Sequence, residues 1–315
     1  KRFRFGLSIN HAVCIRVCLG VALLSGSLAH AATFNVNQVT DVIDADTLDG
    51  ICDSDLGAPG RQCTLRAAVM QANALPGKDK INLRAKLYTL TIPPSGGGGV
   101  DEEEGDLDID LSVANTNSLT IKGKGRGTII SARGLGDRVL EVSGFGETLL
   151  LNKLTITGGS DVANGGGIFN TSGRVRLKEV MVVGNSALTG GGIYNQFGNM
   201  VLISSTVANN SVEFEGGGIT NVFSSASMWL NNVTIANNSA EQGGSGINDT
   251  TFSTTNLYNV TLTQNSSLTN SAALRVLSAT VNVSHSIIAG QVSGDDCDFG
   301  TVISAGYNIE SGTSW

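Results

Sequence analysis

The sequence predicts an all-β protein that folds as a parallel β-helix, a stack of short strands wound into successive coils. The first observation is a repeated sextet, Gly-Gly-Gly-Ile-x-Asn, which ends at Asn170, Asn195 and Asn221. The second is an apolar, strand-like unit that recurs every 25 to 28 residues and is led by Leu151, Leu177, Leu202, Leu230, Leu257 and Val283. The third is an Asn-Ser pair that closes several units, at Asn185, Asn210, Asn238 and Asn265. A fixed period in this range is typical of folds in which each repeat stacks on the next.

Residues 1–31 are predicted to be a signal peptide. They begin with three cations, continue with the apolar run Val17–Leu24 and end in the small-x-small pattern Ala29-His30-Ala31. We therefore expect an exported protein, outside the cell or on the outer-membrane surface of a bacterium. No second apolar stretch is long enough to span a membrane, so we expect no transmembrane segment in the mature chain.

Composition excludes several classes of protein. Without the signal peptide the chain carries 16 basic and 27 acidic residues, a net charge near −11. Such an acidic chain disfavours nucleic acid and anionic membranes as partners. Gly, Ser, Thr and Asn are abundant, and because these residues are poor helix formers the bulk of the chain is not expected to be helical.

Residues 32–79 are predicted to cap the N-terminal end of the β-helix, where an uncovered coil would expose an unpaired strand edge. The cap is expected to contain one helix that begins after Thr64, because four apolar residues share a helical face and Pro76-Gly77 ends the pattern. Cys52 and Cys63 flank a short loop rich in Gly, Asp and Pro, and we expect them to form a disulfide. Cys297 is then left unpaired.

Residues 80–315 are predicted to form about nine coils, with the chain truncated at its C-terminal end. Less regular strand candidates precede the repeats, at Lys80–Thr91, Asp106–Leu111, Leu119–Ile121 and Val139–Val142. In each unit the apolar residues fall mostly at alternate positions or in short β-branched runs, which indicates a strand with one buried face.

The glycine triplets are interpreted as structural. They either supply a positive φ at a turn or let the backbone pass a neighbouring coil closely. A phosphate-binding loop is the functional alternative, but neither a lysine nor a helix follows the triplets. The Asn side chains of the Asn-Ser pairs are expected to form a ladder across the coils. The repeat marks are Gly165, Gly166, Gly167, Ile168, Gly190, Gly191, Gly192, Ile193, Gly216, Gly217, Gly218 and Ile219.

The segment Cys63–Asn73 resembles the CSLREA motif, which marks the N-terminal end of secreted bacterial parallel β-helix proteins. The glycine-rich coils are also similar to those of chlamydial polymorphic outer-membrane proteins. The resemblance implies a single-stranded, right-handed, pectate-lyase-like solenoid with an N-terminal helical cap. The motif residues assigned to the cap are Thr64, Leu65, Arg66 and Asn73. This chain departs from the motif at Ala67, where the family has a Glu that would complete a capping box.

No catalytic arrangement emerges from the sequence. His285 is expected inside a strand, Arg275 has no acidic neighbour in the sequence, and Asp295-Asp296 are expected in a turn. No zinc, haem or nucleotide signature is present, and we expect no cofactor. Two acidic stretches are interpreted as solvated loops, with calcium binding as the alternative. The candidate ligands are Asp41, Asp44, Asp46, Asp49, Asp106 and Asp108.

We expect a secreted or cell-surface β-helix protein, adhesin-like or structural and non-catalytic. Its expected partners are glycans or host-surface proteins, and nucleic acid is not among them. Phe169 and Tyr194 occupy equivalent places in consecutive coils, where an aromatic ladder would form either inside or outside the coils, burial being the more common outcome for such residues. The alternative is a polysaccharide lyase or glycoside hydrolase that acts on an acidic or plant-type polysaccharide. Three or more carboxylates within about 8 Å on one outward groove would favour that enzyme.

Overall fold

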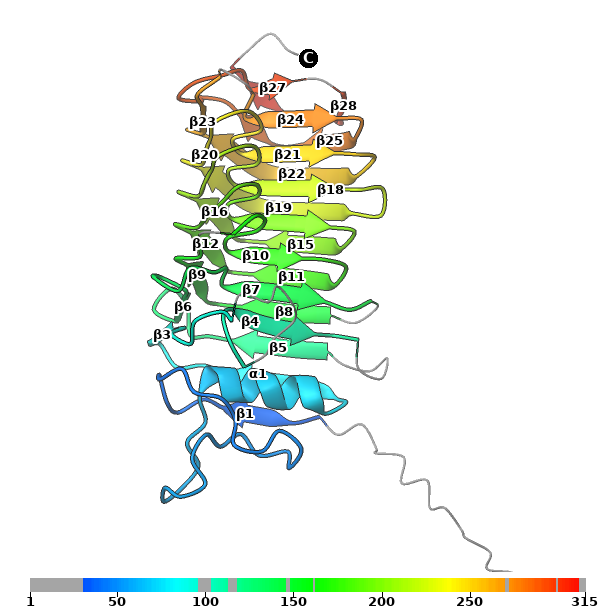
Figure 1. The fold of residues 1–315 in the computed structure, drawn as a ribbon. Helices are drawn as coiled ribbons and strands as arrows, with labels where there is room; N and C mark the ends of the chain where they lie inside the picture. The colour runs from blue at the N-terminus through cyan, green and yellow to red at the C-terminus, as the bar shows by residue number, and fades with distance from the viewer. Residues whose placement is uncertain are drawn as a thin grey trace, which may run out of the picture.

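The computed structural model describes residues 31–95, 103–112, 118–145, 148–160, 162–269, 272–298 and 300–311. The predicted signal peptide, apart from its last residue, lies outside these ranges. The described chain forms a parallel β-solenoid in which the strands stack as arrows along one axis (Figure 1). One helix, α1 (Leu65–Ala74), lies at the N-terminal end of the stack. No helix among the described residues is long and apolar enough to cross a membrane.

Three sheets run along the stack, and every strand pairing in the described ranges is parallel. The 17-stranded sheet contains β1 (Thr33–Asn35), β2 (Lys78–Asn82), β3 (Leu87–Thr89), β5 (Ser118–Lys122), β6 (Ile129–Ser131), β8 (Thr148–Asn152), β9 (Thr155–Thr157), β11 (Arg174–Lys178), β12 (Met181–Val183), β15 (Asn199–Ile203), β16 (Thr206–Ala208), β19 (Ser227–Ala236), β22 (Thr254–Thr263), β25 (Thr280–Ser284), β26 (Ile287–Ile288), β28 (Thr301–Ser304) and β29 (Ile309–Glu310). The eight-stranded sheet contains β4 (Leu107–Asp110), β7 (Leu140–Ser143), β10 (Ile168–Asn170), β14 (Ile193–Gln196), β18 (Ile219–Val222), β21 (Ile247–Thr250), β24 (Leu274–Leu277) and β27 (Cys297–Asp298). The four-stranded sheet contains β13 (Ser186–Ala187), β17 (Ser211–Val212), β20 (Ser239–Ala240) and β23 (Ser266–Ser267).

The register of the sheets confirms the alignment of the sequence repeats. Leu151 pairs with Leu177, and the series continues without a slip through Leu202, Leu230, Leu257 and Val283. The isoleucines that follow the glycine triplets, Ile168, Ile193 and Ile219, also pair in succession. All of these residues are buried, so the core is a column of aliphatic side chains from successive coils.

The regular part of the solenoid has about six turns. From β7 to β24, successive strands of the eight-stranded sheet begin 25 to 28 residues apart, whereas β4 precedes β7 by 33 residues and β27 follows β24 by 23. The number of regular turns is smaller than the nine coils expected from the sequence, because that expectation included the less regular segments at both ends.

The strand-like unit does not form the single straight strand that the sequence suggested. The first of these units is divided between β8 and β9, and Lys153 between them adopts φ 57°. The equivalent residues of later coils, from Glu179 to His285, also have positive φ. Each unit therefore bends the chain at a corner, which alternation of apolar residues does not reveal because both arms bury the same kind of side chain.

The glycine triplets combine the two structural roles that were considered as alternatives. The first glycine of each triplet has a positive φ, as at Gly190 with 64°. The third glycine lies against the next coil: a Cβ on Gly192 would be 2.5 Å from the carbonyl oxygen of Gly218 and 2.8 Å from the amide nitrogen of Asn210. The triplet thus turns the chain with its first residue and allows close coil contact with its third.

Two ladders of buried amide side chains cross the coils. In the turn ladder, which the Asn-Ser pairs predicted, each Nδ2 donates to the side-chain oxygen of the next coil at 3.0 to 3.4 Å, in the order Asn185, Asn210, Asn238, Asn265 and Gln291. In the strand ladder, formed by the last residue of the sextets, the distances are 2.7 to 3.0 Å, in the order Asn170, Asn195, Asn221 and Asp249. The ladders satisfy polar groups that would otherwise be costly to bury.

Asp249 ends the strand ladder with a carboxylate where the other members carry an amide. Burial raises its pKa, although hydrogen bonds from Ser253, Thr255 and Asn221 oppose that shift. Its Oδ2 atom is buried without a hydrogen-bond partner in the described structure. Folding therefore favours the protonated acid over the ionised form.

We expect Asp249→Asn to stabilise the protein at neutral pH by about 1 kcal/mol, because it removes the cost of a buried charge. A carboxyl group whose pKa is raised by folding contributes no penalty below its unfolded pKa, and the penalty grows as the pH rises through the folded pKa. Urea unfolding of both proteins should thus give equal stabilities below the ordinary Asp pKa of 3.8 and a widening gap above it. A constant difference at all pH values would contradict this explanation.

The N-terminal segment is fastened to the first coils by buried polar contacts. The Thr64 hydroxyl oxygen accepts the Ala67 N–H at 3.1 Å, so Thr64 is the N-cap of α1, as predicted. Arg66 is buried; its Nε and Nη2 donate to the two carboxylate oxygens of Asp41 at 2.7 and 3.1 Å. The Asn73 amide donates to the Asp108 carbonyl at 2.8 Å, which joins the end of α1 to β4.

The predicted disulfide between Cys52 and Cys63 is present, and Cys297 is free and buried. The double variant Cys52→Ser/Cys63→Ser should lower the free energy of unfolding by roughly 2–3 kcal/mol, because the disulfide closes a loop of 11 residues in the unfolded chain. Chemical denaturation under non-reducing conditions measures the loss. Cys297→Ser serves as the control, and an equal loss in both variants would argue against the loop-closure explanation.

Candidate ligand-binding face

The outward side of the eight-stranded sheet carries one row of chemically varied side chains. Because side chains alternate along a strand, Ile168 and Asn170 point into the core and Phe169 points outward. The strand register places one such outward residue on each coil. In order along the stack the row consists of Asp108, Glu141, Phe169, Tyr194, Thr220, Asn248, Arg275 and Asp298.

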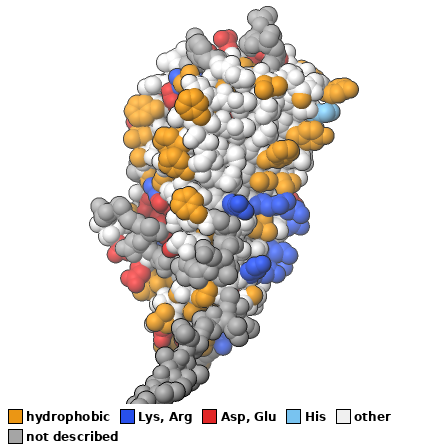
Figure 2. All heavy atoms as spheres, turned by 90° about the vertical axis from the view of Figure 1, so that its right-hand side faces the viewer, with side chains coloured by type: hydrophobic (Ala, Val, Ile, Leu, Met, Phe, Trp, Pro, Cys, Tyr) orange, Lys and Arg blue, Asp and Glu red, His pale blue; other side chains and the backbone are white. Residues whose placement is uncertain are grey.

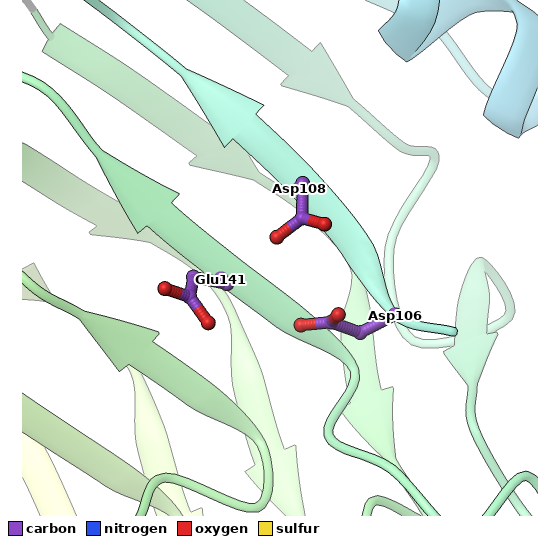
Figure 3. Close-up of side chains that lie close together, drawn as sticks. All are labelled: Asp106, Asp108 and Glu141. Carbon is purple, nitrogen blue, oxygen red and sulfur yellow. The ribbon is translucent and has the colours of Figure 1, made fainter. Parts of the chain in front are cut away.

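The N-terminal end of this row is a carboxylate cluster formed by Asp106, Asp108 and Glu141 (Figure 3). One oxygen from each residue lies within 4.8 Å of the others. Asp106 and Asp108 are buried and Glu141 is half-buried. Calcium–oxygen distances are about 2.3–2.6 Å, so oxygens with this separation fit around one cation. Among the described residues no other group of three acidic, histidine or cysteine side chains meets this criterion.

Contacts from helix α1 hold the cluster in place. Arg66 donates to the carbonyl oxygens of Gly105 and Asp106 at 2.7 and 3.0 Å, and Asn73 donates to that of Asp108. The Asp137 carboxylate accepts the Asp106 N–H at 3.3 Å. Side chains of α1 and Asp137 therefore hold the backbone around Asp106 and Asp108 in position.

Burial and mutual repulsion change the proton affinity of the cluster. Burial, followed by the carboxylates of Asp108 and Asp137, raises the pKa of Asp106 well above its ordinary range. Burial also raises the pKa of Glu141, against the opposing effect of Arg138. Arg138 forms an ion pair with Glu141, and its Nε lies 4.0 Å from Asp106 Oδ2, which has no hydrogen-bond partner among the described residues. The cluster can thus hold a proton or a cation in addition to the arginine.

Two aromatic rings continue the row. The Arg138 guanidinium lies 5.0 Å from the centroid of the Phe169 ring, and Phe169 meets Tyr194 edge-on with centroids 5.6 Å apart. Both rings are half-buried on the outward face, so of the two placements considered the outward one is found and the more common one, burial, is not. The core positions of these strands are instead filled by the isoleucines and asparagines on either side of each ring.

The C-terminal end of the row is also charged. Arg275 forms an ion pair with Glu215, which lies 60 residues earlier in the chain, and the Asn248 amide donates to the other oxygen of Glu215 at 3.1 Å. Burial raises the pKa of Asp298, and Arg275 opposes that shift. Arg275 therefore has an acidic partner that its sequence neighbours did not reveal.

The other calcium candidates are engaged in the N-terminal loop. Asp41 binds Arg66 and also accepts the Thr91 and Ile92 N–H groups. Asp44 accepts the backbone N–H groups of Asp46 and Asp53 together with the Gln71 amide. These contacts, and equivalent ones from Asp46 and Asp49, are those of a hydrogen-bonded loop. The interpretation of this stretch as a loop stays a prediction, with calcium binding as its alternative.

His285 does not lie inside a strand as expected. It occupies a corner between β25 and β26 with φ 52°, and its ring lies between those of Tyr258 and Tyr307, with centroids 5.1 and 4.9 Å away. Asp296 is buried and accepts the N–H and hydroxyl of Ser311, 15 residues later in the chain, at 2.9 and 2.7 Å. Burial raises the pKa of Cys297 to about 12.

A shallow groove of about 690 Å³ follows the four-stranded sheet. Four serines in register line it: Ser186, Ser211, Ser239 and Ser266. The carboxylate cluster does not line this groove. The three carboxylates are thus close enough together for the enzyme hypothesis, which required them within about 8 Å of one another. That hypothesis also required them to line an outward groove, and they do not line this one.

No protein-family model, curated protein or solved structure matches the chain. The sequence interpretation singled out Asp106 and Asp108 but missed Glu141, Arg138 and Glu215. An alignment of the apolar pairs Leu107/Ile109 and Leu140/Val142 would have placed Glu141 beside Asp108, because the strands pair in that register. No repeated pattern marks Glu215 or Arg138.

Proposed function

We propose that the chain is an exported bacterial surface protein of the CSLREA type, a right-handed β-helix capped by α1, that binds glycans or surface proteins without catalysis. The single observation that carries this proposal is the outward row of the eight-stranded sheet. It combines carboxylates, aromatic rings and a guanidinium group in one line across consecutive coils, in which Phe169, Tyr194 and Arg275 are partly exposed while Thr220 and Asn248 between them are buried. Rings beside charged hydrogen-bonding groups are the chemistry that sugar rings and protein side chains require for recognition.

Burial of the carboxylate cluster favours binding over catalysis. Asp106 and Asp108 are almost fully covered, and Arg138 already compensates the charge of Glu141. A general acid must reach the atom that it protonates, which a buried side chain does not do without movement. The half-buried rings of Phe169 and Tyr194 are the more accessible part of the row.

A glycan array probed with the protein tests the proposal. Phe169→Ala and Tyr194→Ala should each weaken binding to any captured glycan by about fivefold or more, since one aromatic contact contributes about 1 kcal/mol or more. Trp229→Ala is the matched control, because Trp229 is exposed on the 17-stranded sheet. Equal losses in all three variants, or no captured glycan or surface protein, would reject the proposed face.

The second candidate function is a glycoside hydrolase or polysaccharide lyase, and the spacing of the three carboxylates favours it. A carboxyl group whose pKa burial raises, as at Asp106 and Glu141, beside a further carboxyl group is an arrangement that glycoside hydrolases use for acid–base chemistry. A depolymerisation screen would detect new reducing or unsaturated sugar ends. If such ends appear with the parent protein and disappear in Glu141→Gln but not in Glu179→Gln, the enzyme replaces the binding protein as the better explanation.

A further inference from the structure

The outward side of the 17-stranded sheet is basic near the N-terminal end of the stack, although the chain as a whole is acidic. Figure 2 shows Lys and Arg side chains gathered on this side of the molecule. They form a set that we name the basic wall, which comprises Lys80, Arg84, Lys122, Lys124, Arg174, Arg176 and Lys178. The net charge of the whole chain is −7, so this gathering of cations does not follow from composition.

Alternation along the strands turns the cations of β2, β5 and β11 outward, while Arg84 and Lys124 lie just after β2 and β5. In β11 the exposed residues Arg174, Arg176 and Lys178 flank the buried Val175 and Leu177. In β5 the buried Leu119 and Ile121 likewise leave Lys122 exposed. The wall is thus a consequence of the same register that builds the core.

The cations of the basic wall have no acidic partner among the described side chains. The one ion pair at its border joins Lys153 to Glu179 at 3.5 Å. Seven uncompensated cations close together repel one another, which costs free energy unless an anion screens them. The arrangement therefore favours an anionic ligand.

A hollow of about 480 Å³ lies within the wall. Four of the cations line it, namely Lys80, Arg84, Lys122 and Lys124, together with the amide side chains of Asn35 and Asn82. The second group of cations, on β11, lies two strands beyond β5 in the register Lys122, Asn152, Lys178. At about 4.8 Å per strand the two groups are separated by about 10 Å. A ligand that contacts both must therefore be a chain with several charges.

The outward residues of β2, β5, β8 and β11 that the structure describes include no aromatic side chain. Proteins that bind single-stranded nucleic acid stack bases on aromatic rings, and this wall offers none. Amide groups and lysines can instead bind sugar hydroxyl and carboxylate groups. These features favour a polysaccharide over a nucleic acid.

We infer that the basic wall binds a linear anionic polysaccharide that carries a carboxylate on each sugar. The polymer lies along the stack, with one part in the hollow and the next part across β11. This site lies on a different sheet from the carboxylate and aromatic row, so the inference does not depend on the proposed function of that row.

Binding of the full chain to polygalacturonate, with neutral dextran as the comparison, tests the inference. Polygalacturonate should bind, and its affinity should fall as salt is added, while dextran should not bind. The reversals Lys122→Glu/Lys124→Glu and Arg174→Glu/Arg176→Glu should each reduce the affinity by about tenfold or more. Arg61→Glu/Arg133→Glu, which changes two exposed cations outside the wall by the same charge, should leave it nearly unchanged. Lys122→Gln/Lys124→Gln gives a second, milder test if a reversal impairs folding.

Three results would overturn the inference. Polygalacturonate that binds no better than dextran would show that the wall does not recognise the polymer. An equal loss in the Arg61/Arg133 variant would show that net charge alone governs binding. Tighter binding of a DNA duplex than of polygalacturonate at matched salt and charge would assign the wall to nucleic acid. Phe169→Ala should retain polygalacturonate binding, which separates this test from that of the outward row.

Discussion

Gly192→Ala is expected to destabilise the solenoid by about 3 kcal/mol or more. The added methyl group would lie 2.5 Å from the carbonyl oxygen of Gly218 in the next coil, and backbone at that distance cannot give way as a side chain can. It would also press on Asn210 Nδ2 and Val207, at 2.8 and 3.0 Å. Relief requires two coils to separate, which breaks backbone hydrogen bonds such as that from Gly192 N to Gly217 O.

Urea unfolding monitored by circular dichroism measures this loss. Gly127→Ala is the matched control, since its added methyl group would meet only the Ala85 Cβ at an ordinary 3.6 Å and its φ is not positive. The control should stay within about 0.5 kcal/mol of the parent protein. If Gly192→Ala behaves like Gly127→Ala, the coils are less tightly packed than the structure shows.

Asn210→Ala is expected to cost about 3 kcal/mol as well, for a different reason. The Asn210 side chain donates to Asn238 Oδ1 and to the Val182 carbonyl, and its oxygen accepts both the backbone and side-chain N–H groups of Asn185. Removal leaves several buried groups of Asn185 and Val182 without a partner, and each such group costs about 1–3 kcal/mol. The smaller side chain also leaves a cavity.

Asn199→Ala provides the control for the ladder variant. Asn199 is exposed, and its one side-chain contact is with Ser227 Oγ on the neighbouring coil. The control should change the free energy of unfolding by about 0.5 kcal/mol or less. Comparable losses in Asn199→Ala and Asn210→Ala would mean that burial of the ladder does not determine its contribution.

Local periodicity was sufficient to predict the stacked coils. Every leading residue from Leu151 to Val283 pairs with its predicted counterpart because a one-residue slip would turn a whole strand inside out. The turn ladder followed from the Asn-Ser pairs for the same reason. The strand ladder was not predicted. Asp249 replaces the Asn that ends the earlier sextets, so the sequence repeat stops there, although in the structure Asp249 accepts the next hydrogen bond of the ladder.

The corners could not be predicted from hydrophobic pattern. Lys153, Glu179 and His285 have little in common chemically, yet each adopts a left-handed conformation at the same point of its coil. The geometry of the coil imposes that conformation, and residues of different chemical type adopt it. Placing His285 inside a strand was wrong for this reason.

The candidate site was harder to predict than the fold. Asp106 and Asp108 belong to a motif-like stretch, whereas Glu141 and Arg138 come from an irregular coil 33 residues later, and Glu215 and Arg275 are 60 residues apart. Only the stacking of coils brings these groups together. The basic wall was hidden in the same way, because its lysines and arginines are scattered over about 100 residues of an acidic chain.

The two amide ladders have a direction. In each of them the bonds between rungs run one way, from a side-chain nitrogen to the side-chain oxygen of the next coil. The nitrogens of the turn ladder also donate to backbone carbonyls of the preceding coil. The side-chain amide dipoles of consecutive rungs therefore point the same way, as peptide dipoles do in an α-helix. Unlike in a helix, the positive end of each ladder lies toward the C-terminal end of the stack. The strand ladder places Asp249 at that pole, where the hydrogen bond from Asn221 opposes the rise in its pKa that burial causes. An acid at the first rung, Asn170, would instead lie at the negative end of the strand ladder, where its charge would be less favourable than at the last rung.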